Sequence, residues 1–143
     1  MNVETILRNK GNWVATIRPD ATIAEAVDML HKERIGAIVV SEDGAGVDGI
    51  LSERDIVKAV SAGGAAALEE KITARMTREV ITCGPQDTMA ELMGRMTAGR
   101  FRHLPVVENG RLVGIISIGD VVKHRLAEME RESSALRDYI MTA

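Results

Sequence analysis

The chain has 143 residues, which is enough for one domain or for two small units that share a core. Charged residues make up 27% of the sequence and aromatic residues only 2%, so the core is expected to be aliphatic. The formal net charge of −3 argues against a nucleic-acid partner, and the apolar runs are too short to predict a membrane span.

The first predicted unit begins with a strand in residues 13–18 and a helix after Thr22. Thr22 and Glu25 match a capping box, in which a hydroxyl and a carboxylate three residues later bind free N–H groups at a helix start. Apolar residues at helical spacing predict the buried stripe: Ile23, Val27 and Leu30. We therefore expect one face of this helix to lie in the core.

Two further strands and a second helix complete this unit. Apolar runs in residues 36–40 and 49–52 flank turn-forming residues, which predicts a hairpin, and helical spacing resumes after Ser52. Residues 1–64 are therefore assigned to a first unit with its N-terminal segment, in the order strand, helix, strand, strand, helix. Residues 65–78 are predicted to be a connector that packs rather than a flexible linker.

The second unit, residues 79–126, repeats the first, and residues 79–84 are expected to form its first strand. Matched positions lie 66 residues apart (85 − 19): Pro19 and Pro85, Thr22 and Thr88, Glu25 and Glu91. The predicted stripe of its helix is Met89, Met93 and Met96. In the following hairpin, Ile35 and Gly36 are aligned with Arg102 and His103, and Ile38 with Pro105.

A short motif occurs once in each unit, as GILSERDIV in residues 49–57 and GIISIGDVV in residues 114–122. Its glycine, serine and aspartate recur 65 positions later (114 − 49): Gly49 and Gly114, Ser52 and Ser117, Asp55 and Asp120. One interpretation is a helix cap, worth about 1 kcal/mol at each site. The other is a ligand site, because a helix N-terminus attracts phosphate and an ionised carboxylate accepts hydrogen bonds from a diol.

With these paired motifs and helices, the chain resembles a tandem pair of cystathionine-β-synthase (CBS) domains, and the resemblance covers residues 1 to about 125. It implies an α/β fold of two pseudo-symmetric β-α-β-β-α units packed sheet to sheet, with a long C-terminal helix. It also implies a stand-alone sensor or regulatory module that binds an adenosyl ligand: AMP, ADP, ATP, NAD or S-adenosylmethionine. The alternative is a ligand-free pair that serves as a dimerisation or protein-interaction scaffold.

The family pattern also implies two unlike ligand clefts, in which the aspartate holds the ribose and the serine contacts ribose or phosphate. For the Asp120 cleft the implied residues are Ser117, Asp120, Arg102, His103, Ile35, Gly36, Ala37 and Thr16. For the Asp55 cleft they are Ser52, Arg54, Asp55, Thr82 and Leu104. Lys10 is a further phosphate candidate. Because the basic side chains differ, the Asp120 cleft is expected to favour a phosphate near the ribose.

No pattern in the sequence favours catalysis. The three histidines lack metal-ligand spacing, there is no phosphate-binding P-loop, and Cys83 is interpreted as a small buried residue rather than a nucleophile. A single cysteine excludes an internal disulfide framework, and no signal peptide is recognised, so a cytoplasmic location is expected. We therefore expect neither an enzyme nor a metal site.

The C-terminal extension, residues 127–143, continues a helix with a heptad-like stripe. The apolar members of the stripe are Val122, Leu126, Met129, Leu136 and Ile140, with Ser133 in the missing place. We expect a symmetric homodimer in which Leu126, Met129 and Leu136 are partly buried. A sensor role also implies a regulated partner protein, which the sequence does not identify.

Overall fold

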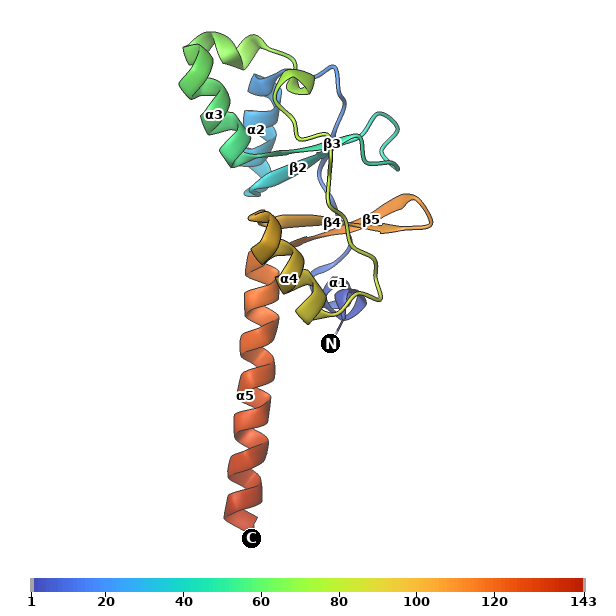
Figure 1. Cartoon of the computed structure of the whole chain (residues 1–143), viewed down its shortest axis with the longest axis vertical. Helices are drawn as coiled ribbons and strands as arrows, with labels where there is room; N and C mark the ends of the chain where they lie inside the picture. The colour runs from blue at the N-terminus through green and yellow to red at the C-terminus, as the bar shows by residue number, and fades with distance from the viewer. Residues whose placement is uncertain (1, 143) are drawn as a thin grey trace.

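Two small sheets face each other in the middle of the molecule, and helices cover the outer face of each (Figure 1). The computed structural model describes residues 2–142. This arrangement confirms the predicted α/β fold of two related units packed sheet to sheet and followed by a long helix.

The first unit contains a three-stranded sheet and two helices. Its elements are β1 (Thr16–Ile17), α2 (Ile23–Glu33), β2 (Ala37–Val40), β3 (Gly49–Ser52) and α3 (Glu53–Gly63). Strand β1 is parallel to β2, and β3 is antiparallel to β2. Its core is aliphatic, as the composition predicted, and includes Ile23, Ile38 and Leu51.

The second unit has the same order with one exception. Its elements are α4 (Met89–Gly99), β4 (His103–Glu108), β5 (Arg111–Ser117) and α5 (Ile118–Thr142). The strand expected in residues 79–84 is reduced to a single parallel bridge between Cys83 and Val106. The extended pairing ends there because the N–H of Gly84 donates to the Asp87 carboxylate at 2.8 Å, which turns the chain toward α4.

The helix starts follow the predicted threonines, although only half of each capping box forms. The hydroxyls of Thr22 and Thr88 accept hydrogen bonds from the N–H groups of Glu25 and Glu91 at 3.2 and 3.3 Å. Within residues 2–142 neither glutamate carboxylate returns a bond to the threonine N–H. The threonine cap alone therefore fixes these helix starts.

The buried helix faces differ from the predicted stripes by one position. Val27 and Met93 are 36% and 43% exposed, whereas Ala26 and Leu92 are fully buried. In each helix the buried residue follows the first residue of the stripe, Ile23 or Met89, by three positions, and the exposed one follows it by four. The sheet therefore contacts the alanine and the leucine, and Val27 and Met93 lie at the edge.

An additional helix, α1 (Val3–Lys10), precedes the first unit and packs on the second. Val3 and Ile6 are fully buried in the core of the second unit. The N–H groups of Val3 and Glu4 donate to the carbonyls of Asp87 and Pro85, both at 2.9 Å. The N-terminal segment thus precedes the first unit in sequence but packs on the second unit.

The connector packs on the first unit as two short 3₁₀ helices, η1 (Gly64–Glu69) and η2 (Ile72–Ala74). Ile72 is fully buried, and its N–H donates to the carbonyl of Ala21 at 2.9 Å. This bond ties the connector to the start of α2.

The hairpin register corrects the sequence alignment by one residue. Ala37 is paired with Ser52, and His103 is paired with Ser117, so Ala37 is the structural equivalent of His103. Gly36 accordingly matches Arg102. The motif glycines agree with this alignment, because Val40 and Val106 lie opposite Gly49 and Gly114.

Candidate ligand-binding cleft

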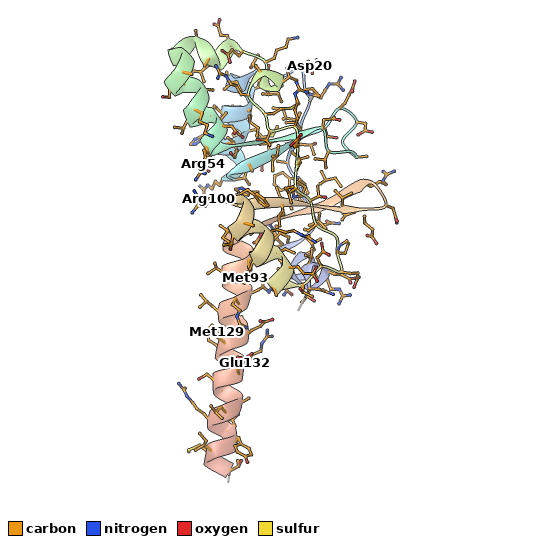
Figure 2. All side chains as sticks on the ribbon, in the orientation of Figure 1. Asp20, Arg54, Met93, Arg100, Met129 and Glu132 are labelled. Atoms are coloured by element: carbon orange, nitrogen blue, oxygen red, sulfur yellow. The ribbon has the colours of Figure 1, made fainter. Side chains whose placement is uncertain are left out.

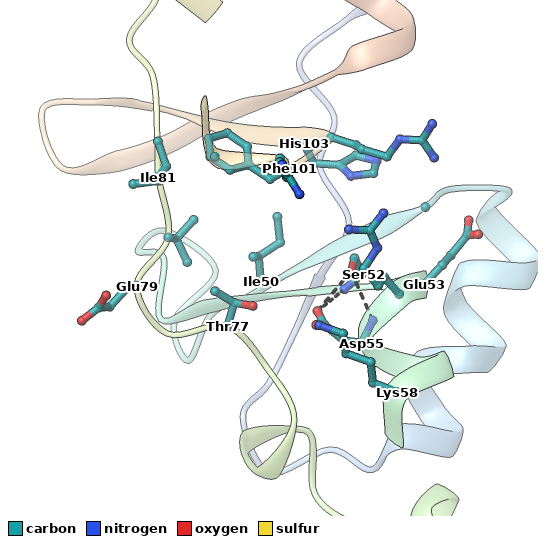
Figure 3. Close-up of a pocket in the computed structure, with 16 residues that line it drawn as sticks. Ile50, Ser52, Glu53, Asp55, Lys58, Thr77, Glu79, Ile81, Phe101 and His103 are labelled. Atoms are coloured by element: carbon teal, nitrogen blue, oxygen red, sulfur yellow. Dashed lines mark hydrogen bonds between the residues drawn. The ribbon is translucent and has the colours of Figure 1, made fainter. Parts of the chain in front are cut away.

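A cavity of about 640 Å³ lies where the first motif meets the second unit (Figure 3). It is lined by Gly36, Ile50, Ser52, Glu53, Arg54, Asp55, Lys58, Thr77, Glu79, Val80, Ile81, Gly99, Arg100, Phe101, Arg102 and His103. Three parts of the chain form its walls: the start of α3, the extended segment before the second unit, and the approach to β4.

Ser52 and Asp55 form a complete capping box at the start of α3. The N–H and hydroxyl of Ser52 donate to Asp55 Oδ2 at 2.9 and 3.1 Å, and the N–H of Asp55 donates to the Ser52 hydroxyl at 3.4 Å. Asp55 Oδ1 accepts no hydrogen bond from residues 2–142. The cap therefore holds the carboxylate in place and leaves one oxygen available to a ligand.

Gly49 allows the second wall to approach. A Cβ at this position would lie 2.7 Å from Met76 Sδ and 2.9 Å from the carbonyl oxygen of Thr77. Thr77 also exchanges two backbone hydrogen bonds with Ile50, of 3.0 and 2.9 Å. The motif glycine thus permits residues 77–81 to lie along β3 and line the cavity.

The third wall brings His103 against the first unit. A Cβ on Gly36 would lie 3.3 Å from His103 Cε1 and Nε2, so the imidazole packs on the glycine. Burial lowers the pKa of His103 below 6.5; the charge of Glu53 acts in the opposite direction, and that of Arg102 adds to the lowering. The ring is therefore biased toward its neutral form.

Basic side chains gather on one side of the cavity. Arg54, Arg100 and Arg102 line both the cavity and an adjoining groove of about 530 Å³. Lys58 adds a fourth cation to the cavity, where the acidic residues are Glu53, Asp55 and Glu79. The arrangement suits a ligand that carries both a diol and an anionic group.

The second motif has the same cap, with a different neighbour. The N–H of Ser117 donates to Asp120 Oδ2 at 2.8 Å, and the N–H of Asp120 donates to the Ser117 hydroxyl at 3.1 Å. Lys10 Nζ forms a salt bridge to the same Oδ2 at 2.7 Å and donates to the carbonyl of Ile115 at 3.0 Å. Partial burial opposes ionisation of Asp120, but the bonds from Lys10 and Ser117 outweigh it and lower its pKa below 3.8.

The structure regroups the residues predicted for the two clefts. Those that line the cavity are Ser52, Arg54 and Asp55, as grouped from sequence, together with Gly36, Arg102 and His103, which were assigned to the other cleft. Those outside its lining are Thr16, Ile35, Ala37, Thr82 and Leu104. Leu104 is fully buried in the core of the second unit, because its side chain points to the opposite face of β4 from His103.

The lining residues missed from sequence are Ile50, Glu53, Lys58, Thr77, Glu79, Val80, Ile81, Gly99, Arg100 and Phe101. Lys58 follows Asp55 by three residues on one helix, so helical spacing is a signal that places both on one face. Thr77 and Arg100 carry no such signal, because they reach the site through the packing of the two units.

Three further features bear on the chemistry of the chain: the cysteine thiol, metal-binding groups and membrane-spanning helices. Burial raises the pKa of the Cys83 thiol to about 12, and the charge of Asp87 adds to the effect, which fits the prediction of a buried residue rather than a nucleophile. Residues 2–142 contain no group of His, Cys, Asp and Glu side chains that would hold a metal ion. Across the same residues, none of the helices has the length and apolar character required to cross a membrane.

Comparison with known proteins identifies the class to which this site belongs. The family model of the CBS domain matches residues 14–62 and 70–127, and the chain therefore belongs to the CBS domain family. The CBS domain-containing protein YhcV of Bacillus subtilis is 32% identical, over 86% of this chain and 86% of that relative. The crystal structure of the CBS-domain containing protein ATU1752 from Agrobacterium tumefaciens has 52% identity and a TM-score of 0.85, over 87% of this chain and 99% of that one.

Two similar solved structures are complexes with adenosyl compounds. The CBS domain protein PAE2072 from Pyrobaculum aerophilum, solved with AMP, is 28% identical, with a TM-score of 0.75 over 84% of this chain and 89% of that one. The CBS domain pair of protein MJ0100, solved with 5′-methylthioadenosine and S-adenosyl-L-methionine, is 26% identical, with a TM-score of 0.79 over 90% and 98%. An adenosine group is common to all three ligands.

Proposed function

We propose that the chain binds an adenosyl ligand in the cavity that contains Ser52 and Asp55, and that it acts as a regulatory module without catalytic activity. The observation that carries this proposal is a carboxylate, held at a helix start, that shares one cavity with four basic side chains. The volume of about 640 Å³ lies within the range of small-molecule sites. The complexes of similar CBS-domain structures give further support.

In this binding mode Asp55 accepts hydrogen bonds from the ribose hydroxyls. An ionised carboxylate only accepts, and a vicinal diol offers two donors, so the two groups are complementary. The N-terminus of α3 faces the same cavity and favours negative charge. The apolar part of the lining offers a surface for adenine: Ile50, Val80, Ile81 and Phe101.

Among adenosyl ligands we propose a phosphorylated one, such as AMP, ADP, ATP or NAD. Arg54, Arg100 and Arg102 lie at the boundary between the cavity and the adjoining groove, so a phosphate chain would meet three guanidinium groups. S-adenosylmethionine carries a positive sulfonium in place of the phosphate and is disfavoured by the same charges.

Calorimetry with AMP, ATP, NAD, S-adenosylmethionine and 5′-methylthioadenosine tests the proposal. The double variant R100A/R102A should bind AMP about tenfold more weakly and bind 5′-methylthioadenosine unchanged, because only AMP loses charge-assisted contacts. Arg111→Ala, which changes an exposed arginine at the start of β5, is the matched control. Failure of every compound to bind would contradict the proposal.

We also propose that the protein works as a symmetric homodimer and that ligand binding is communicated to a separate regulated protein. The exposed apolar side chains of α5 support the dimer. The regulatory role draws on the names of the similar proteins described above, none of which is an enzyme name.

A ligand-free scaffold is the second candidate function, and one observation favours it. Both aspartates serve as helix caps, and helix capping alone would account for the repeated motif. The purified protein distinguishes the candidates: a sensor releases an adenine chromophore on denaturation or is stabilised by a nucleotide, whereas a scaffold shows neither.

A further inference from the structure

Helix α5 leaves the body of the molecule and extends away from both sheets (Figure 1). Val121 is its only fully buried residue among Ile118–Thr142, and every residue from Met129 to Thr142 is exposed. Figure 2 shows Met129 and Glu132 on the part of the helix that has no other element beside it. About half of the helix therefore makes no packing contact within the chain.

The exposed part has a regular apolar stripe. Its positions are Val122, Leu126, Met129, Ser133, Leu136 and Ile140, and they alternate at intervals of 4 and 3, as the d and a positions of a heptad do. The apolar members are 50–65% exposed. Val121, which faces the body, precedes Val122 by one residue, so the stripe is turned by about 100° from the body and is accessible to another helix.

Charged residues flank the stripe in blocks of alternating sign. The e positions are Lys123, Glu130 and Arg137, and the g positions are Arg125, Glu132 and Tyr139. In coiled coils the e and g residues meet across the interface and determine orientation and partner choice. The charges at the e and g positions therefore indicate which partner helix, and which orientation, is complementary to α5.

A second copy in parallel orientation is complementary to these flanks. In a parallel pair, each g residue faces the e residue of the next heptad in the partner, which joins Arg125 to Glu130 and Glu132 to Arg137. Symmetry repeats both opposite-charge pairs. Arg125 also bonds Glu128 of its own helix at 3.1 Å, so Glu132 and Arg137 are the more informative pair.

An antiparallel pair with the stripes aligned end to end has the opposite result. There, e residues face e residues and g residues face g residues. Arg125 meets the uncharged Tyr139, and the other pairs become Lys123 with Arg137, Glu130 with Glu130, and Glu132 with Glu132. All three are like-charge contacts, so the flanks disfavour this orientation.

From these observations we propose that α5 forms a parallel two-stranded coiled coil with α5 of a second copy, with Glu132 and Arg137 paired across the interface. The inference rests on the proposed homodimer and is independent of the ligand. A coil of less than three heptads is short, so it adds to contacts of the bodies and fixes how the two copies are oriented.

Cross-linking of the full chain tests the orientation. In the Ile140→Cys variant a parallel coil places the two new thiols together, so oxidation should give a covalent dimer. In the antiparallel pair the same residues lie about 27 Å apart along the helix axis, and no disulfide forms. Arg131→Cys, on the opposite face of the helix, is the control and should stay uncross-linked; the native Cys83 is buried.

Charge variants test the pairing. Arg137→Glu places two carboxylates together in the parallel coil and should raise the dimer dissociation constant about tenfold in sedimentation equilibrium. The double variant E132R/R137E should restore it, and Arg131→Glu, which makes the same charge change off the stripe, should leave it unchanged. In an antiparallel coil Arg137→Glu would instead tighten the dimer, because the introduced carboxylate would meet Lys123.

The outcomes separate the inference from the proposals on which it stands. A monomer at all concentrations overturns both the homodimer and the coil. A dimer that neither cross-links at position 140 nor distinguishes R137E from R131E overturns the coil alone. Nucleotide binding by the wild type and the variants is measured in parallel. A wild-type protein that binds no nucleotide would overturn the proposed ligand and would leave the coiled coil unaffected.

Discussion

The two Ser-x-x-Asp motifs have nearly the same local geometry and very different surroundings. The serine N–H lies 2.9 Å from Asp55 Oδ2 in one and 2.8 Å from Asp120 Oδ2 in the other. Asp55 faces a cavity shared with the second unit, whereas Asp120 forms a salt bridge with Lys10. The motif itself therefore does not determine which groups surround its carboxylate.

The segment that covers each motif makes the difference. Met76 and Thr77 approach Gly49 as extended chain, and the following residues line a cavity. At Gly114 the neighbour is Leu7 of α1, and the last turn of that helix brings Lys10 to Asp120. Lys10 therefore neutralises the Asp120 carboxylate, whereas Asp55 has no salt bridge among residues 2–142.

The largest expected effect is on ligand binding by the Asp55→Ala variant. Removal of hydrogen bonds to a charged group costs about 1.5–3 kcal/mol, so nucleotide affinity should fall about 10- to 150-fold. Asp120→Ala should leave affinity in the Asp55 cavity largely unchanged. Calorimetry on both variants checks the contrast.

Apo stability supplies the control for that comparison. Both alanine variants lose a helix cap and should be destabilised by about 1 kcal/mol. If Asp55→Ala lowers the apo melting temperature while nucleotide affinity holds, the carboxylate only caps the helix and the ligand assignment is wrong. Asp55→Asn, which keeps shape and an acceptor, separates charge from capping.

The motif glycines should differ in their tolerance of alanine. At Gly49 the added methyl would meet a backbone carbonyl at 2.9 Å, whereas at Gly114 its nearest atoms belong to the flexible end of Leu7. Gly49→Ala should therefore cost about 2–3 kcal/mol and Gly114→Ala about 1 kcal/mol. Urea denaturation measures both; equal losses would show that the covering segments are equally movable.

The salt bridge at the second motif should make stability depend on pH. The pKa of Asp120 is lowered, so its pairing stabilises the fold above the ordinary value of 3.8 and is lost as pH falls through the folded-state pKa. Lys10→Met should reduce stability by about 0.5–1 kcal/mol near pH 7. The difference from wild type should disappear in acid, and a constant difference would argue against an ionic origin.

His103 should give the smallest effect. Burial lowers its pKa below 6.5, and the facing charges are Glu53, Arg102, Lys10 and Asp120. Stability is full above pH 6.5 and falls as pH decreases toward the folded-state pKa, because the unfolded chain takes up the proton first. His103→Gln should remove this dependence on pH, which amounts to less than about 1 kcal/mol of unfolding free energy. Thermal melts of both proteins between pH 5 and pH 8 measure it.

Local signals predicted much of this molecule. Thr22, Thr88, Ser52 and Ser117 mark helix starts because each hydroxyl caps a backbone N–H only three residues away, and such contacts are visible in sequence. The Asp120–Lys10 pair was not predicted, since 110 residues separate its members. No local sequence pattern indicates that α1, which precedes the first unit, packs on the second unit.

The same reasoning explains the regrouping of the cleft residues. Arg102 and His103 were assigned to the motif of their own unit, as the resemblance to the CBS family implied. The facing of the two sheets also brings them to the Asp55 cavity, where His103 packs on Gly36, although His103 still pairs with Ser117 across the hairpin. The sequence alignment of the hairpins was also wrong by one residue, so it did not show that Gly36 and Arg102 are equivalent. Their equivalence is visible in the hydrogen bonds: the carbonyl of Gly36 accepts one from the first N–H of α3, and the carbonyl of Arg102 accepts one from the first N–H of α5.

Helix α5 begins directly after Ser117 of the second motif, so a change in direction at its first turn would move the whole helix. Its first N–H is held by the carbonyl of Arg102 at 2.8 Å, beside the cavity, and its 25 residues span about 37 Å without interruption. A tilt of about 10° at this pivot would displace the far end by about 6 Å. A small rearrangement around Arg102 would thus be amplified into a displacement of several ångströms at the far end of the helix.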